Sequence, residues 1–123
     1  MYRTAIEKLY KWKDGKHRKP LIIEGARQVG KTWLMKEFGS KAYAETVYIN
    51  FDSNSGMAEL FAADLNTDRL IMGLELFTGR KINPDRTLLI FDEVQEVPRA
   101  LSSLKYFYEN APQYHIICAG SLL

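Results

Sequence analysis

The segment PLIIEGARQVGKTWLMKEF (residues 20–38) decides the fold class of this 123-residue chain. Residues 20–24 form an apolar run without alternation, which is typical of a strand that is covered on both faces. Residues 31–38 show the spacing of apolar side chains that indicates a helix, and Gly39 is expected to stop it. Between them, GARQVGKT (25–32) contains two glycines, a lysine and a threonine. The segment therefore predicts a strand, a glycine-rich loop and a helix in direct succession.

The rest of the chain continues this alternation of strands and helices. The further predicted elements are a helix over 2–13, a strand over 46–52, helices over 56–63 and 67–78, a strand over 87–93, a helix that Pro98 opens and a strand over 115–121. Asn66 or Thr67 is a suitable N-cap for the helix over 67–78, and Gly79 lies just past its end. Apolar strands that alternate with helices predict an α/β fold with a parallel sheet flanked by helices.

Composition and charge fit one globular domain. Hydrophobic residues make up 46% of the chain and charged residues 26%, which excludes a disordered chain. The net charge of +2 is too small to imply a nucleic-acid partner by itself. No apolar stretch is long enough to cross a bilayer, and the N-terminus lacks the apolar core of a signal peptide. The single cysteine, Cys118, cannot form an internal disulfide, which favours a cytoplasmic location.

The GARQVGKT segment matches the phosphate-binding pattern G-x-x-x-x-G-K-[ST] at every position. Gly25 and Gly30 would let the backbone bend so that successive N–H groups point inward at the N-terminus of the helix. Lys31 would reach the β- and γ-phosphates of a nucleotide, and the hydroxyl of Thr32 would bind Mg²⁺. The residues assigned to the cofactor are Gly25, Arg27, Gln28, Val29, Gly30, Lys31, Thr32 and Trp33. The alternative is a glycine-rich turn that happens to contain a lysine.

A phosphate-binding loop has no group that activates water, and acidic residues at the end of a later strand would supply one. TLLIFDE (87–93) ends in Asp92 and Glu93, at the edge where open α/β sheets bind their ligands. Asp92 would hold the Mg²⁺ shell, and Glu93 would accept a proton from the attacking water. The alternative is that two acids merely end a strand.

Ser121, in CAGSLL (118–123), is a third candidate. It would lie level with Glu93 if the strands over 87–93 and 115–121 are neighbours. Its hydroxyl would then position the attacking water or touch the γ-phosphate. Serine after glycine at a strand end is also common turn chemistry, so the sequence leaves both interpretations open.

Three further features have more than one interpretation. Arg27 either adds to the positive field around the phosphates or pairs with an acid such as Glu24. Gln95 either orients water or relays the nucleotide state to the next helix, or it caps the helix that Pro98 opens. A basic stretch over 11–19 either contacts nucleic-acid phosphates, lies near the nucleotide, or is a solvated loop.

Walker A GARQVGKT, Walker B LLIFDE and a sensor-1-like AGS, in this order, resemble the AAA+ superfamily of P-loop ATPases. RKPLIIEGARQVGKT, FDEVQEVP and HIICAGSLL look more specifically like a prokaryotic AAA+-type group that typically carries a C-terminal domain of unknown function. The resemblance implies ATP and Mg²⁺ as ligands and a core sheet of strand order 5-1-4-3-2. It also implies that residues 1–123 are an ATPase core from a longer protein, ending before the last core strand and the helical lid. In AAA+ proteins an arginine finger often comes from a neighbouring subunit, which leaves self-association open.

Three functions compete at this stage. The first is Mg²⁺-dependent ATP hydrolysis by the core of a larger prokaryotic protein, with Lys31, Glu93 and Ser121 as catalytic residues and Thr32 and Asp92 on the metal. The second is a nucleotide-dependent switch that controls a DNA or protein partner with little turnover. The third is a small-molecule kinase, against which the adjacent acidic pair counts, because a kinase must exclude water rather than activate it.

Overall fold

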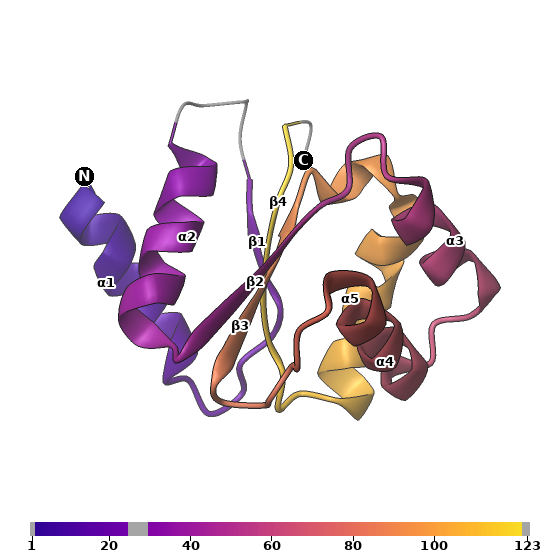
Figure 1. The fold of residues 1–123 in the computed structure, drawn as a ribbon. Coiled ribbons are helices and arrows are strands. Elements are labelled where there is room, and N and C mark those ends of the chain that lie inside the picture. Colours follow the sequence, from indigo (N-terminus) through magenta and orange to yellow (C-terminus); the bar gives the residue numbers. More distant parts are fainter. Residues whose placement is uncertain (1, 25–29, 122–123) are drawn as a thin grey trace.

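The computed structural model describes residues 2–24 and 30–121, drawn in colour in Figure 1. The elements are α1 (Tyr2–Lys13), β1 (Leu21–Ile23), α2 (Lys31–Ala42), β2 (Glu45–Asn50), α3 (Ser55–Ala63), α4 (Thr67–Thr78), β3 (Thr87–Asp92), the short 3-10 helix η1 (Val94–Glu96), α5 (Pro98–Asn110) and β4 (His115–Ala119). Of these, only η1 was not expected from the sequence. No helix in the described part of the chain has the length and apolar character that a membrane span requires.

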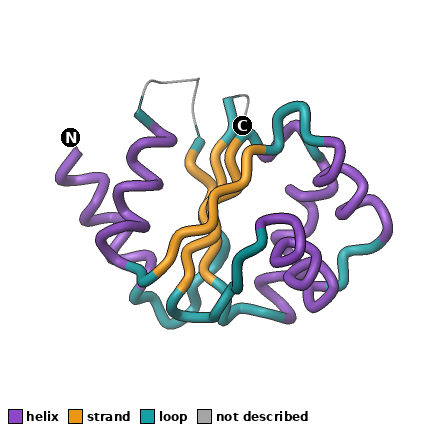
Figure 2. Tube along the Cα trace, viewed as in Figure 1, coloured by secondary structure: helices purple, strands orange, loops and turns teal. Residues whose placement is uncertain are grey.

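The four strands form one parallel sheet in the order β1-β4-β3-β2. This order agrees with the one expected for these four strands, and the predicted α/β fold class is confirmed. α1 and α2 cover one face of the sheet, and α3, α4 and α5 cover the other (Figure 1). Because the strands are parallel, their carboxyl ends all lie at the same edge of the sheet, as the tube view in Figure 2 shows.

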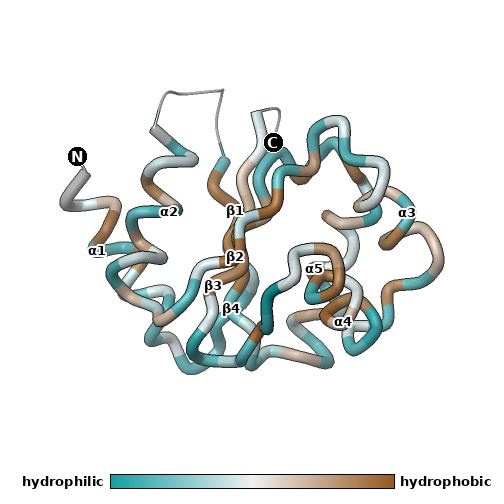
Figure 3. Tube along the Cα trace, viewed as in Figure 1, coloured by the Kyte–Doolittle hydropathy of each residue, from teal (hydrophilic) through white to brown (hydrophobic). Residues whose placement is uncertain are grey.

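The two central strands are buried along their whole length, so apolar side chains point to both faces. Leu89 and Phe91 belong to the core beneath α3, α4 and α5, whereas Leu88 and Ile90 belong to the core beneath α1 and α2. Figure 3 shows hydrophobic residues gathered along the strands between the two helical layers. Cys118 lies within the first core, where burial raises the pKa of its thiol. It packs as a small apolar residue, as expected.

The prediction that Gly39 ends the second helix is wrong. α2 continues to Ala42, and Tyr43 caps it by donating its N–H to the carbonyl of Gly39. A Cβ on Gly39 would lie only 2.3 Å from Thr46 Oγ1 of β2. The glycine is therefore needed because helix and strand approach closely here, and not because the chain turns.

Each of the four predicted strands ends earlier than expected, β2 at Asn50 instead of residue 52, and the differences at β3 and β4 affect the site. β3 ends at Asp92, because Glu93 adopts a left-handed backbone with φ 53° and leads into η1. β4 ends at Ala119, so Ser121 lies in a turn beyond the strand. The first predicted strand likewise stops at Ile23, one residue before Glu24.

The predicted limits of α4 are confirmed together with their physical causes. The side chain of Asn66, rather than Thr67, accepts a hydrogen bond from the N–H of Arg69 and caps the helix. Gly79 follows the last residue with φ 69°, the left-handed conformation that glycine adopts without strain.

His115 is a buried titratable group far from the strand ends that carry the candidate site. His115 is the first residue of β4 and is 4% exposed. Nδ1 is hydrogen-bonded to the Tyr43 hydroxyl, and Nε2 lies 3.4 Å from Asp85 Oδ1 without hydrogen-bond geometry. Burial, followed by the nearby charge of Arg18, lowers the pKa of His115 to about 4. The imidazole is thus neutral in the folded protein at neutral pH.

We expect the stability of the fold to fall as the pH drops from about 6.5 to about 4. In that window the unfolded chain protonates His115 and the folded chain does not, so protons favour unfolding; the loss reaches about 3 kcal/mol at the lower end. Unfolding midpoints between pH 4 and 7.5 measure the effect. His115→Gln should flatten this pH dependence, whereas the matched change at the exposed His17, His17→Gln, should leave it intact. Equal slopes for wild type and His115→Gln would contradict the assignment.

Candidate functional site

The predicted site residues meet at the carboxyl edge of the sheet. Asp92, the last residue of β3, pairs in register with Ala119, the last residue of β4. Glu93 follows Asp92 directly, and Ser121 lies two residues beyond Ala119. α2 begins at Lys31 over the same edge, so three segments distant in sequence converge there (Figure 1).

Thr32 and Asp92 are in direct contact. Thr32 Oγ1, in the first turn of α2, donates a hydrogen bond of 2.6 Å to Asp92 Oδ2. Asp92 is only 7% exposed, and the backbone N–H of Glu93 donates to its other oxygen, Oδ1, at 3.0 Å. These donors offset the cost of burying a carboxylate. The contact places the two residues expected to hold Mg²⁺ side by side.

Tyr48 is a third partner of this carboxylate that the sequence analysis did not identify. Its hydroxyl donates to Asp92 Oδ2 at 2.7 Å. Burial, followed by the hydrogen bond to Asp92, raises the pKa of Tyr48 above its ordinary value, so the phenol stays protonated and remains a donor. The signal was present in the pairing of β2 with β3, since Tyr48 pairs with Ile90, and Asp92 lies two residues further on the same face.

Gly30 adopts a left-handed backbone, which favours glycine. It precedes α2 with φ 112°, in the left-handed region, and its carbonyl accepts the N–H of Leu34 at 2.7 Å. A Cβ at this position would meet no atom of the described residues within 4 Å. Any other residue would be strained here by its backbone and not by crowding.

Lys31 connects the helix N-terminus to the end of β4. Its Nζ donates to the carbonyl of Gly120 at 3.3 Å. The ammonium group thus lies beside the turn that carries Ser121. Trp33, also assigned to the cofactor, is 55% exposed in the first turn of α2. The assigned residues Gly25, Arg27, Gln28 and Val29 lie outside the described part of the chain, so their roles stay predictions.

Glu93 is held by side chains from two different segments. The hydroxyl of Ser121 lies 3.0 Å from Oε1 and 3.1 Å from Oε2 of Glu93, and the N–H of Ser121 lies 3.3 Å from Oε1. From the other side, Gln95 Nε2 donates to Oε1 at 2.9 Å. The two strands are neighbours, so Ser121 lies level with Glu93 as predicted. What the serine does in a reaction stays a prediction.

The interpretation that Gln95 caps the helix opened by Pro98, one of those that the sequence left open, is wrong. Val97 is the N-cap of α5, and no side chain caps that helix end. Gln95 instead lies within η1, and its amide points to acidic side chains. Pro98 occupies the first turn of α5 and lacks an N–H, so fewer N–H groups need a capping acceptor there.

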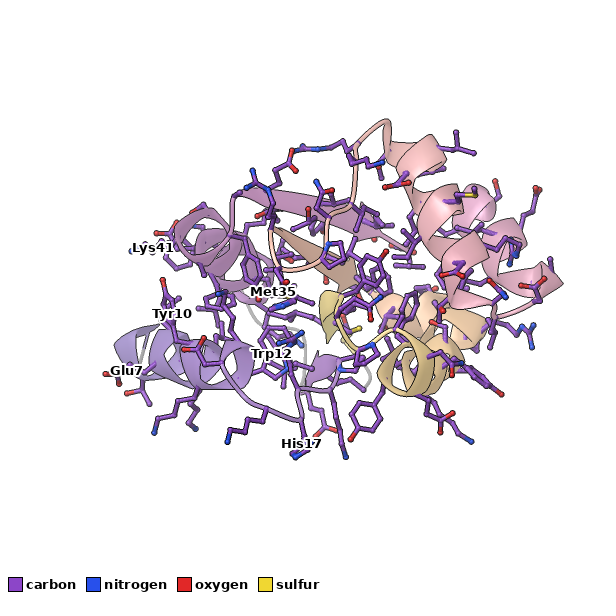
Figure 4. All side chains as sticks on the ribbon, turned by 90° about the horizontal axis from the view of Figure 1, so that it is seen from below. Glu7, Tyr10, Trp12, His17, Met35 and Lys41 are labelled. Carbon is purple, nitrogen blue, oxygen red and sulfur yellow. The ribbon has the colours of Figure 1, made fainter. Side chains whose placement is uncertain are left out.

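The basic stretch over 11–19 does not lie near the candidate site. It precedes β1 and therefore lies at the amino edge of the sheet, opposite Asp92 and Glu93. Figure 4 views the molecule from that side, with Trp12 and His17 labelled. Arg18 donates to the carbonyls of Lys13 and Pro112, which fastens the stretch to α1 and to the turn before β4. One interpretation expected this stretch to lie near the nucleotide, but it lies away from the edge that carries the candidate site.

The donor set fits a hard cation bound together with phosphate. A hydroxyl and a carboxylate lie within 2.6 Å of one another beside a helix N-terminus and a lysine. Mg²⁺ prefers oxygen ligands and is usually held by one or two protein groups, with waters and substrate phosphates completing the shell. The residues described include no group of three or more His, Cys, Asp or Glu that could hold a metal by protein ligands alone. The site therefore suits Mg²⁺ that arrives with a nucleotide.

Comparison with known proteins identifies the family and supports the fold. Residues 17–123 match the family described as an AAA domain. A structure of C. elegans PCH-2 is similar in fold, with a TM-score of 0.50 and 15% sequence identity, over 96% of this chain and 35% of that one. The chain thus spans about a third of the length of that relative. No curated protein matches the sequence significantly. Because the family match extends over most of the chain, from before β1 to Leu123, this protein belongs to the AAA-domain family.

Proposed function

We propose that this chain binds ATP with Mg²⁺ and hydrolyses it at the carboxyl edge of the sheet. AAA domains are in general ATPases, and the chain belongs to that family. The observation that carries the proposal for this chain is the contact between Thr32 Oγ1 and Asp92 Oδ2 at 2.6 Å, which joins the helix after the glycine-rich loop to the strand that ends in two acids.

Binding would rest on the segment that leads into α2. The N–H groups of the first helical turn and the ammonium of Lys31 would bind the phosphates, because both present positive charge at the same place. Thr32 and Asp92 would share Mg²⁺, replacing the hydrogen bond that they make with each other. Tyr48 would keep the Asp92 carboxylate in place during this exchange, since its hydroxyl binds the same oxygen.

Hydrolysis would need a base, and Glu93 is the group proposed for that role. The water oxygen forms a bond to the γ-phosphorus, the bond from that phosphorus to the ADP oxygen breaks, and Glu93 accepts the proton from water. Lys31, together with Mg²⁺ that Thr32 and Asp92 would hold, would supply charge that offsets the negative charge on the phosphates. Ser121 would keep the Glu93 carboxylate at the level of the phosphates, as its two short contacts with that carboxylate suggest.

The proposal also includes a narrower family group, the ligand, self-association and the location in the cell. We infer that it belongs to the prokaryotic AAA+-type group with a C-terminal domain of unknown function, on the strength of GARQVGKT, FDEVQEVP and HIICAGSLL. The proposed partner is ATP or ADP, and self-association is proposed by analogy with AAA+ proteins. A cytoplasmic location is proposed from the single, buried cysteine.

Thermal unfolding of the chain with and without Mg·ATP tests the proposal. ATP at a hundred times its dissociation constant should add about 2.7 kcal/mol, which raises the unfolding midpoint by several degrees. Removing Mg²⁺ with EDTA should reduce the shift, because Thr32 and Asp92 then have no cation to share. Phosphate release, measured with protein in excess over ATP, tests turnover. A chain that shows neither a thermal shift nor heat of binding in calorimetry contradicts the proposal.

A further inference from the structure

We propose that Gln95 is a positioning residue for Glu93, an inference that rests on the proposed function and names a further residue of the same site. The side-chain amide of Gln95 lies in η1, two residues beyond Glu93. The left-handed backbone of Glu93 and the hydrogen bond from the N–H of Glu96 to the carbonyl of Glu93 fold the chain tightly here. This local fold brings the two side chains together.

Both N–H groups of the Gln95 amide have carboxylate acceptors. Nε2 donates to Glu93 Oε1 at 2.9 Å and to Glu96 Oε2 at 3.3 Å. Because a carboxylate can only accept at neutral pH, these two neighbours fix which end of the amide carries the nitrogen. The orientation of Gln95 therefore follows from its surroundings.

The other end of the amide is left unsatisfied. Gln95 Oε1 is buried and has no hydrogen-bond partner among the described residues. A buried acceptor without a donor costs free energy, whereas an apolar side chain of the same length would fill the space without that cost. The carbonyl end of Gln95 therefore does not contribute to stability, and the N–H groups indicate what the residue supplies.

Gln95 restrains the carboxylate of Glu93, the proposed base. Ser121 holds the Glu93 carboxylate from the turn after β4, and Gln95 holds it from η1. A glutamate side chain has several rotatable bonds, so one donor restrains it less than two donors on different segments. Catalytic groups must stay close to their productive position, and a displacement of about 1 Å can lower a rate about 100-fold. Losing Gln95 should therefore slow hydrolysis without weakening ATP binding.

Gln95→Met tests this inference, because methionine keeps the length and flexibility of the side chain and removes both N–H donors. We expect the single-turnover rate of ATP hydrolysis to fall about 10- to 100-fold. We expect the dissociation constant for Mg·ATP to stay within about twofold of wild type, and the unfolding midpoint of the ligand-free protein not to fall. The matched control is Gln113→Met, at an exposed glutamine in the turn before β4, which should change none of the three quantities.

The alternative outcomes separate this inference from the proposed function. If wild type hydrolyses ATP and Gln95→Met does so equally fast, the positioning role is wrong and the proposed function stands. If the rate and the unfolding midpoint fall together, Gln95 supports the fold and does not position the base. A wild-type protein that does not hydrolyse ATP overturns the proposed hydrolysis, and the inference with it.

Discussion

Lys31→Ala is expected to remove the thermal shift that Mg·ATP gives the wild-type protein. Lys31 is the first residue of α2, and its ammonium lies 3.3 Å from the carbonyl of Gly120, beside the turn that carries Ser121. Alanine removes the charge that would meet the β- and γ-phosphates. Truncating one partner of such a charge pair typically costs about 2–5 kcal/mol of binding free energy. The stabilisation by ligand at the concentration that saturates wild type should then largely disappear.

Calorimetric titration of Mg·ATP, together with unfolding midpoints, measures this effect. Lys41→Ala is the matched control, because Lys41 lies in the same helix and pairs at the surface with Glu37, at 3.4 Å. An exposed pair of this kind contributes at most about 1 kcal/mol, so Lys41→Ala should bind ATP as wild type does. If Lys31→Ala binds as tightly as wild type, GARQVGKT is a glycine-rich turn and not a phosphate-binding loop. The proposed function would then lose its basis.

The sequence predicted the fold class because a strand that is buried on both faces consists of consecutive apolar residues. TLLIFD has no polar residue in the middle, and the structure buries it on both faces as β3. The phosphate-binding pattern also fixed the position of α2, since lysine and threonine must open the helix. Gly39 was misjudged because local sequence does not distinguish a glycine that ends a helix from one that allows close packing. Only the position of Thr46 on β2 distinguishes the two.

The candidate site was only partly predictable, for reasons that concern neighbours across the sheet. Asp92, Glu93 and Ser121 were identified because each lies at or just beyond the end of an apolar strand, and parallel strands end at one edge. Tyr48 was missed because its role depends on the pairing of β2 with β3, which sequence spacing alone does not give. The contact of the Gln95 amide with Glu93 was not predictable, because it depends on the left-handed backbone at Glu93. Residues that position another side chain, such as Tyr48 and Gln95, are therefore difficult to identify from the sequence alone.

Glu93→Gln is expected to stop hydrolysis while ATP binding persists. The variant removes the basic carboxylate but keeps an oxygen that can accept the hydrogen bonds from Ser121 and Gln95, so the local geometry should survive. General-base catalysis contributes typically about 10²- to 10⁴-fold, and the single-turnover rate should fall within that range. The dissociation constant for Mg·ATP should change little, because Lys31, Thr32 and Asp92 are intact. Glu109→Gln, at an exposed position of α5, is the control for loss of one negative charge.

The comparison of rate with affinity decides what Glu93 does. Hydrolysis at the wild-type rate would show that Glu93 is not the base, and that another group accepts the proton. An equal loss of rate and affinity would show that Glu93 supports the binding site through its contact with Ser121. If hydrolysis stops in the full-length protein while its biological output continues, the bound nucleotide itself is the signal. In that case the contacts that hold Glu93 would serve a nucleotide-dependent switch, and turnover would only reset it.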